Sequence, residues 1–180
     1  MGVTFHEEKV RVLIDEQTLQ ARVRELGAQI TKDYRGQDLT ILAILKGSVF
    51  FACDLARHID LPLELEVMGA SSYHGGTETT GEVRITTDVS KPLAGKNVLV
   101  VEDIVDTGLT MKFLLENLAA RHPASIRLCS LLEKPSRARA KLDIHYKGFV
   151  IDDVFVVGYG LDYQERYRNL PFIGEMKGTP

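Results

Sequence analysis

The segment from Val98 to Thr110 holds the densest group of residues that could do chemistry. An apolar run, Val98-Leu99-Val100-Val101, ends at the acids Glu102 and Asp103, and Asp106-Thr107-Gly108-Leu109-Thr110 follows soon after. A turn into a helix at this place would expose backbone N–H groups at the positive end of the helix dipole, where a phosphate monoester binds well. The two acids could accept from sugar hydroxyls, directly or through a divalent cation. Two acids at a strand end are, by themselves, equally typical of a solvated edge or a helix N-cap.

Other residues with chemical potential are spread along the chain. Lys46 and Gly47 follow the apolar run that ends at Leu45, and Lys134 closes another apolar run. Taken singly, each has an ordinary interpretation: Lys46-Gly47 is a turn and Lys134 a surface lysine. Phe155 is then a core residue and Arg168 a partner in a surface ion pair. Only their order along the chain makes a functional interpretation specific.

That order resembles a known family. Two acids, two aliphatic residues and then Asp-Thr-Gly-x-Thr after an apolar strand resemble the phosphoribosyl pyrophosphate signature of the type I phosphoribosyltransferases. Further segments occur in the order seen in hypoxanthine-guanine phosphoribosyltransferases: Leu45-Lys46-Gly47-Ser48, Ser72-Tyr73, Glu133-Lys134-Pro135, Phe155-Val156-Val157-Gly158-Tyr159, Leu161-Asp162-Tyr163 and Arg168. The resemblance runs from about residue 45 to residue 168. It implies transfer of a phosphoribosyl group from phosphoribosyl pyrophosphate to hypoxanthine, guanine or both, with Mg²⁺ as cofactor.

The resemblance also implies a role for each matching residue. Asp106 would be the catalytic residue, sharing a proton near N7 of the base. The residues that would bind phosphoribosyl pyrophosphate are Lys46, Gly47, Ser72, Tyr73, Glu102, Asp103, Asp106, Thr107, Gly108, Leu109, Thr110 and Arg168. Those that would bind the purine are Lys134, Phe155, Val156 and Asp162, and those that would hold magnesium are Glu102, Asp103 and Asp162. The family keeps the peptide bond that enters the lysine of Lys46-Gly47 in a non-proline cis form, which is rare elsewhere.

Alternating helices and strands must position these residues. Leu19, Val23, Leu26 and Ile30 recur at helical spacing, whereas residues 40–45 and 97–101 are continuous apolar runs of strand length. The expected elements are helices around residues 19–30, 49–59 and 111–118 and strands at 40–45, 63–67, 97–101, 125–132 and 153–157. This order predicts an α/β fold with a Rossmann-like parallel sheet flanked by helices. Ligands would bind beyond the carboxyl ends of its strands.

The chain, residues 1–180, is predicted to form a single phosphoribosyltransferase domain with its core at about 36–157. A small hood would come from the N- and C-terminal segments. The stretch from Gly69 to Gly81 is polar and rich in glycine and threonine, and long loops of this kind inside compact domains are usually functional or disordered. We expect a flexible lid loop at about 69–85 that excludes water from the reaction, with a plain flexible hairpin loop as the alternative.

Composition excludes several other classes. The formal net charge of −3 gives no overall basic field for nucleic acid or an anionic membrane. No run approaches the ~20 apolar residues of a membrane span, and Cys53 and Cys129 lie in apolar runs that predict buried free thiols. We therefore expect a cytoplasmic protein whose partners are phosphoribosyl pyrophosphate and 6-oxopurine bases, without nucleic acid or membrane. The resemblance implies a homodimer or homotetramer.

Two alternatives remain at this stage. One is a phosphoribosyltransferase for another base, such as xanthine or a pyrimidine, although the pair Lys134 and Phe155 favours a 6-oxopurine. The other is a regulatory protein that keeps the fold and binds RNA or DNA. Such a protein needs a basic face, and the one cluster of lysine and arginine in the sequence is Lys134–Lys141.

Overall fold

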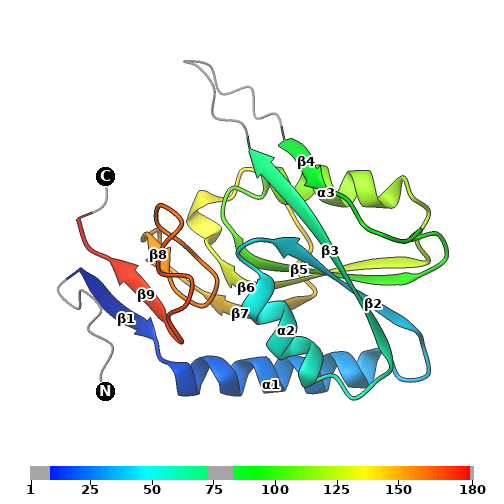
Figure 1. Ribbon diagram of the computed structural model, residues 1–180, viewed down its shortest axis with the longest axis horizontal. Coiled ribbons are helices and arrows are strands. Elements are labelled where there is room, and N and C mark those ends of the chain that lie inside the picture. Colours follow the sequence, from blue (N-terminus) through cyan, green and yellow to red (C-terminus); the bar gives the residue numbers. More distant parts are fainter. Residues whose placement is uncertain (1–8, 73–82, 179–180) are drawn as a thin grey trace.

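The computed structural model describes residues 9–72 and 83–178, which form two sheets and three α-helices (Figure 1). A six-stranded sheet has the order β4-β3-β2-β5-β6-β7, in which only β4 is antiparallel to its neighbour. A three-stranded antiparallel sheet has the order β1-β9-β8. The strands are β1 (Val10–Ile14), β2 (Leu39–Leu45), β3 (Leu63–Ser72), β4 (Val83–Thr87), β5 (Asn97–Val105), β6 (Ser125–Glu133), β7 (Tyr146–Val150), β8 (Val156–Val157) and β9 (Ile173–Met176). The helices are α1 (Glu16–Asp33), α2 (Val49–Arg57) and α3 (Leu109–Ala119), with a 3₁₀ turn at Pro135–Arg137. The expected α/β fold is confirmed.

The central strands are apolar on both faces because helices cover both faces. Ile41 and Leu99 pack with α1 and α2, whereas their neighbours Leu42 and Val100 pack with α3 on the other side. Alternate residues of a strand point to opposite faces, so a strand buried twice must be apolar throughout. This arrangement fixes β5 firmly, and β5 carries the acids Glu102 and Asp103.

One strand was placed in the wrong sheet by the sequence prediction. Of residues 153–157, only Val156 and Val157 form a strand, and β8 pairs antiparallel with β9 in the small sheet. The outer parallel strand is instead β7, which the sequence prediction missed. Its pattern is broken by Gly148, which no larger residue could replace because a Cβ there would lie 2.3 Å from the carbonyl oxygen of Leu131. An edge strand of five residues that is interrupted by Lys147 and Gly148 lacks the apolar run on which the prediction depended.

The small sheet joins the two ends of the described chain. Residue Val10 of β1 pairs with Met176 of β9, so the segments expected to form the hood do lie side by side (Figure 1). The lid loop expected at about 69–85 is not a loop at its described ends, since residues 69–72 belong to β3 and residues 83–85 belong to β4. Its middle, with Tyr73, lies outside the described residues.

Two other expectations concern burial and membranes. Cys129 is buried, as predicted, and burial raises the pKa of its thiol. Cys53 is exposed on α2, so the prediction of two buried thiols was wrong for that residue. The apolar run around Cys53 is a helix with one face in the core and one face outside. In the ranges that the structure describes, no helix is both long enough and apolar enough to cross a membrane.

Candidate active site

The turn between β5 and α3 has the geometry that its sequence predicts. β5 ends at Val105 and α3 begins at Leu109, so Asp106, Thr107 and Gly108 form the turn. Gly108 has a φ of 77°, a left-handed conformation that glycine adopts without the steric cost of a Cβ. The carbonyl oxygen of Thr107 accepts hydrogen bonds from the backbone N–H groups of residues 139 and 140, at 2.9 and 3.1 Å. These hydrogen bonds tie the turn before α3 to residues 139 and 140.

The acids of β5 face the turn after β2. A Cβ at Gly47 would lie 1.6 Å from Oδ2 of Asp103, so the Asp103 carboxylate lies directly against the Gly47 backbone. Burial raises the pKa of Asp103 to about 6. Burial, followed by the charge of Asp103, raises the pKa of Glu102 well above its ordinary value. Oε2 of Glu102 is buried and has no hydrogen-bond partner among the described residues. Oδ1 of Asp103 accepts from the backbone N–H of Ile104 at 2.8 Å, so the acceptor left for a donor or a cation is Oε2 of Glu102.

The turn after β2 contacts the loop that follows β8. The peptide bond between Leu45 and Lys46 is cis, as the family resemblance implied. Gly160 lies against this turn with a φ of 104°, and a Cβ there would come within 1.9 Å of the carbonyl oxygen of Gly47. Only glycine fits at position 160, and the backbones of the two loops therefore pack directly against each other.

Arg168 connects this unit to a group of carboxylates. Its Nη1 donates to the carbonyl oxygen of Gly160 at 2.7 Å, and its Nη2 lies 2.8 Å from Oδ1 of Asp162. Glu165 lies close to both cations, with Oε2 at 2.9 Å from Nζ of Lys46 and Oε1 at 3.4 Å from Nη2 of Arg168. The hydrogen bond from Lys46, and then the charges of Lys46 and Arg168, lower the pKa of Glu165. The structure thus brings five of the predicted site residues close together: Lys46, Gly47, Asp103, Asp162 and Arg168.

A cavity of about 720 Å³ adjoins the turn after β5 and is lined by Asp106, Lys134 and Phe155, among others. Lys134 is buried, which contradicts its ordinary interpretation as a surface lysine. Phe155 is 43% exposed, and its ring contacts Tyr163 edge-on at 5.7 Å between centroids. A phenylalanine in the core would be buried, so Phe155 has a free face for a ligand. Val156 is buried in β8, and neither Val156 nor Asp162 lines the cavity.

Two residues of this cavity were not predicted. Arg137 donates from Nε to Oδ1 of Asp106 at 3.0 Å, and its Nη1 lies 3.5 Å from Oδ2 of Asp153. The other oxygen of Asp153 lies 3.6 Å from Nζ of Lys134. The sequence signal that could have identified Arg137 is its position three residues after Lys134, because the 3₁₀ turn at Pro135–Arg137 brings the two side chains to the same side. These contacts make a chain of alternating charges across the cavity.

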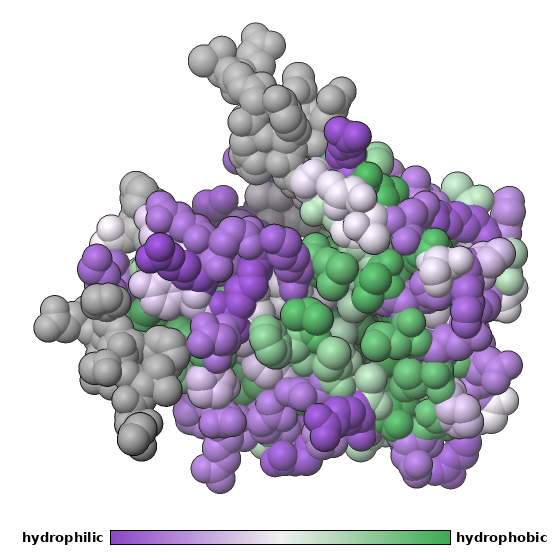
Figure 2. Space-filling view, in the orientation of Figure 1, coloured by the Kyte–Doolittle hydropathy of each residue, from purple (hydrophilic) through white to green (hydrophobic). Residues whose placement is uncertain are grey.

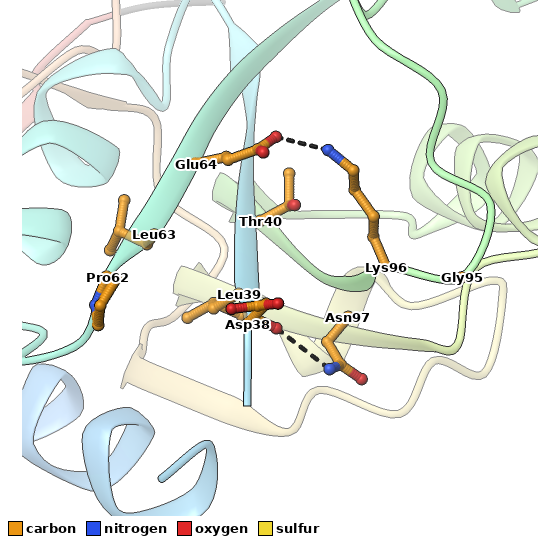
Figure 3. Close-up of a pocket in the computed structure, with 9 residues that line it drawn as sticks. All are labelled: Asp38, Leu39, Thr40, Pro62, Leu63, Glu64, Gly95, Lys96 and Asn97. Atoms are coloured by element: carbon orange, nitrogen blue, oxygen red, sulfur yellow. Dashed lines mark hydrogen bonds and ion pairs between the residues drawn. The ribbon is translucent and has the colours of Figure 1, made fainter. Parts of the chain in front are cut away.

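A second cavity, of about 420 Å³, lies at the opposite edge of the sheet (Figure 3). It is lined at the amino ends of β2, β3 and β5, where Lys96 pairs with Glu64 and Asn97 donates to the carbonyl oxygen of Asp38. None of the predicted site residues lines it. The carboxyl edge, where ligands bind in parallel sheets, is the candidate active site.

Comparison with known proteins shows the family to which the chain belongs. Residues 13–164 match the family model described as a phosphoribosyl transferase domain. A hypoxanthine-guanine phosphoribosyltransferase of Staphylococcus aureus (strain Mu50) is 49% identical over 173 residues, covering 96% of this chain and 97% of the relative. The corresponding enzyme of Mycobacterium avium is 50% identical over 171 residues, covering 92% and 84%.

Solved structures have the same fold. The crystal structure of a hypoxanthine phosphoribosyltransferase from Staphylococcus aureus in a tetragonal space group superposes with a TM-score of 0.93 at 48% identity. The match covers 98% of this chain and 96% of the other. The likeness therefore holds for the amino-acid sequence over nearly the whole chain as well as for the fold.

Proposed function

We propose that this chain, which belongs to the hypoxanthine-guanine phosphoribosyltransferase family, is a purine salvage transferase. It transfers the 5-phosphoribosyl group of phosphoribosyl pyrophosphate to N9 of hypoxanthine, guanine or both. The products are IMP or GMP, and pyrophosphate. The observation that carries the choice of base is the placement of Asp106, Lys134 and Phe155 in one cavity.

Base selection follows from the donors and acceptors at the edge of the ring. The Lys134 ammonium has three donors and no acceptor, so it suits the O6 of a 6-oxopurine and opposes the amino group of adenine. Phe155 offers a free ring face for stacking on the purine. The backbone of Val156 would meet the C2 edge. Sites built to hydrogen-bond one substrate can reject a mismatched one by ~10⁴-fold, so adenine should be excluded.

The reaction displaces pyrophosphate from C1 of the ribose, with positive charge growing on the sugar and negative charge on the leaving group. Asp106 takes or shares the proton near N7 as N9 becomes bonded to ribose. Lys46 and Arg168, with the backbone at Gly47, stabilise the charge on the departing pyrophosphate. Catalysis is then mainly positioning and electrostatic stabilisation.

The remaining residues bind the ribose phosphate. Glu102 and Asp103 would accept from the ribose hydroxyls, and the loop from Thr107 to Thr110, including Gly108 and Leu109, would hold the 5′-phosphate at the start of α3. Ser72 ends β3 at the same carboxyl edge. With Tyr73 it belongs to the proposed lid that excludes water from the activated sugar.

Magnesium fits the oxygen ligands of this site. In the described ranges, no three of the residues His, Cys, Asp and Glu gather as a complete metal cage. Mg²⁺ is commonly held by one or two carboxylates together with substrate oxygens and waters, so a complete cage is not required. The unpartnered Oε2 of Glu102 is the position that a cation would satisfy, and Asp103 and Asp162 are the other proposed ligands. When bound, magnesium would neutralise charge on the pyrophosphate group.

Oligomeric state is the remaining part of the proposal. Apolar side chains gather over β3 and α2 (Figure 2), where Phe50, Leu65 and Val67 are 43%, 49% and 37% exposed. Contiguous exposed apolar groups typically mark an interface. This surface supports a homo-oligomer, with a homodimer as the simplest form.

A product assay tests the proposal. Each of hypoxanthine, guanine, xanthine, adenine and uracil is supplied with phosphoribosyl pyrophosphate and magnesium, and nucleotide products are measured. We expect turnover with hypoxanthine, guanine or both and negligible turnover with adenine, and Lys134→Met should erase much of this preference. Efficient use of adenine would overturn the role of Lys134, and turnover of uracil alone would favour a pyrimidine enzyme. Absence of turnover with every base would favour a binding protein.

A further inference from the structure

The carboxylate of Glu165 occupies the space between the two cations assigned to pyrophosphate. Oε2 lies 2.9 Å from Nζ of Lys46, and Oε1 lies 3.4 Å from Nη2 of Arg168. Lys46 belongs to the turn after β2 and Arg168 to the loop after β8, 122 positions further along the chain. One carboxylate therefore bridges both loops, each oxygen serving a different cation.

The backbone holds Glu165 in this position. Gln164, Glu165 and Tyr167 have φ values of 51°, 62° and 73°, in the left-handed region that side chains other than glycine rarely adopt. The N–H of Glu165 donates to Oδ2 of Asp162 at 2.9 Å, and Tyr163 and Arg166 close the turn with two backbone hydrogen bonds. Non-glycine residues in this region persist only where their surroundings enforce the conformation, and they concentrate at ligand clamps. The position of Glu165 is thus built into the loop.

We propose that Glu165 is an internal counter-anion of the pyrophosphate subsite. In the ligand-free subsite it pairs with Lys46 and, more weakly, with Arg168, whose nearer carboxylate is that of Asp162 at 2.8 Å. The pyrophosphate group of the substrate must displace it from both cations. After the reaction it competes with the product for the same cations and so limits how tightly pyrophosphate is retained. This inference rests on the proposed function and adds a specific residue to it.

The strength of the contacts suits a displaceable anion. The side chains of Lys46 and Glu165 are 68% and 67% exposed, and an ion pair that is so exposed contributes little. Pyrophosphate carries several charges and forms hydrogen bonds with more donors than one carboxylate can reach. Glu165 contacts Arg168 through one nitrogen only, Nη2 at 3.4 Å. The carboxylate covers the cations without saturating the site.

The test measures binding of pyrophosphate to Glu165→Gln by calorimetry at a fixed excess of magnesium. The amide keeps the size of the side chain and removes its charge, so we expect the dissociation constant to fall by about 2- to 5-fold, the range for an exposed ion pair. Higher salt should reduce the difference between variant and wild type, because the competition is between exposed charges. The KM for phosphoribosyl pyrophosphate should fall in parallel, without a rise in kcat.

A matched control removes the same charge elsewhere. Glu64→Gln changes the net charge equally but lies at the opposite edge of the sheet, where Glu64 pairs with Lys96 (Figure 3). It should bind pyrophosphate as the wild type does. Glu165→Asp retains the charge on a shorter side chain and should give a change in the same direction as Glu165→Gln but smaller, which keeps the test valid if the glutamine variant is unstable.

The possible outcomes separate the two proposals. Weaker pyrophosphate binding by Glu165→Gln would mean that Glu165 builds the subsite rather than competes for it, and would overturn the inference. Equal binding by wild type and Glu165→Gln, or an equal gain in Glu64→Gln, would also overturn it. Failure of the wild type itself to bind pyrophosphate would instead reject Lys46 and Arg168 as the pyrophosphate subsite.

Discussion

The carboxylate of Asp106 has one partner in the structure and a second partner in the proposed mechanism. It accepts a hydrogen bond from Arg137 in the described structure, and the proposed mechanism requires it near N7 of the base. Arg137 also contacts Asp153, which in turn lies near Lys134. In the proposed mechanism, Arg137 would keep its contact with Asp153 while Asp106 turned toward the base. The contacts therefore link the residue proposed to recognise O6 of the purine, Lys134, to the residue proposed to take its proton.

We expect Asp106→Asn to lower kcat by ~10²–10⁴-fold, because an amide keeps the shape of the side chain but cannot take the N7 proton. The KM for phosphoribosyl pyrophosphate should change little. The measurement is steady-state kinetics with saturating hypoxanthine. Arg137→Gln is the control, since it breaks the same contact while leaving the carboxylate. An equal loss in both variants would mean that the ion pair, and not proton transfer, explains the effect.

The acid pair of β5 gives a second prediction at the scale of single residues. The pKa of Asp103 is raised to about 6 by burial, from an ordinary value of 3.8. The folded chain therefore binds this proton more tightly than the unfolded chain, and stability is lost as the pH rises from about 4 to about 6. Above pH 6 the ligand-free protein carries a charge that its surroundings disfavour.

Asp103→Asn should therefore raise the melting temperature of the ligand-free protein at pH 7.5. The corresponding gain in the free energy of unfolding is of the order of 1–3 kcal/mol, since one pKa unit corresponds to about 1.4 kcal/mol. It should shrink as the pH is lowered toward 5, and activity should fall because the amide accepts fewer hydrogen bonds from ribose. Thermal melts at several pH values measure this. A melting temperature below that of the wild type at pH 7.5 would contradict the prediction.

At the scale of elements, the sequence predicted the strands and turns that are determined by a local pattern of residues. β5 and the turn into α3 were predictable because a strand buried on both faces must be an apolar run and because Gly108 and its neighbours define the turn. β7 was not, because an edge strand containing Lys147 and Gly148 has no such run. Val156 and Val157 looked like a parallel strand, yet pair with β9 because the chain end folds back.

The site shows the same division. Motif residues were found because their spacing is local to one turn or one strand end. Arg137, Asp153 and Glu165 were missed because their partners lie on other elements: Asp106 contacts Arg137 across 31 positions, and Lys46 contacts Glu165 across 119. No periodicity encodes such pairs. They depend on the order of strands in the sheet and on the path of the loops.

The turn after β2 and the loop after β8, which we propose to bind pyrophosphate and here call the two pyrophosphate loops, meet at Gly47 and Gly160. This contact supplies a prediction at the scale of elements. Gly160→Ala places a Cβ where only 1.9 Å separates it from the carbonyl oxygen of Gly47, so the loops must move apart. We expect the KM for phosphoribosyl pyrophosphate to rise about tenfold or more, because a displacement of ~1 Å can cost two orders of magnitude in rate.

Gly36→Ala is the control that distinguishes displacement of the loops from backbone strain as the cause of the effect of Gly160→Ala. Gly36 has a comparable left-handed φ of 76° but nothing within 4 Å of the added Cβ. It should lose stability by about 1–2 kcal/mol, as a left-handed residue with a Cβ does, with normal kinetics. If both variants show equal changes in KM, the effect of Gly160→Ala is general destabilisation and not separation of the loops.

At the scale of the whole molecule, the apolar surface over β3 and α2 borders the active site. α2 begins at Val49, directly after the turn that contains Lys46. Phe50 of this surface has its ring 6.4 Å from that of Tyr159, which belongs to the other pyrophosphate loop. A partner chain that covers Phe50 would therefore support both loops from outside. In the proposed dimer, association of two chains would be linked to the geometry of the proposed pyrophosphate subsite through the start of α2.

Leu65→Glu tests this arrangement. Leu65 is 49% exposed near the amino end of β3, so a charge there costs the isolated chain little, whereas in a dimer it would be buried without a partner. We expect sedimentation equilibrium to show the wild type as a dimer and the variant with a dissociation constant at least ~10-fold higher, which is about 1.4 kcal/mol. The KM for phosphoribosyl pyrophosphate should rise when the variant is diluted into its monomeric range.

Val150→Glu is the control, because Val150 is 59% exposed on β7 at the far edge of the same sheet. A wild type that remains monomeric at ~50 μM, far above the dissociation constant of a stable homodimer, would reject the surface as a dimer interface. Equal effects of the two substitutions would mean that β7, and not only β3 and α2, contacts a second chain.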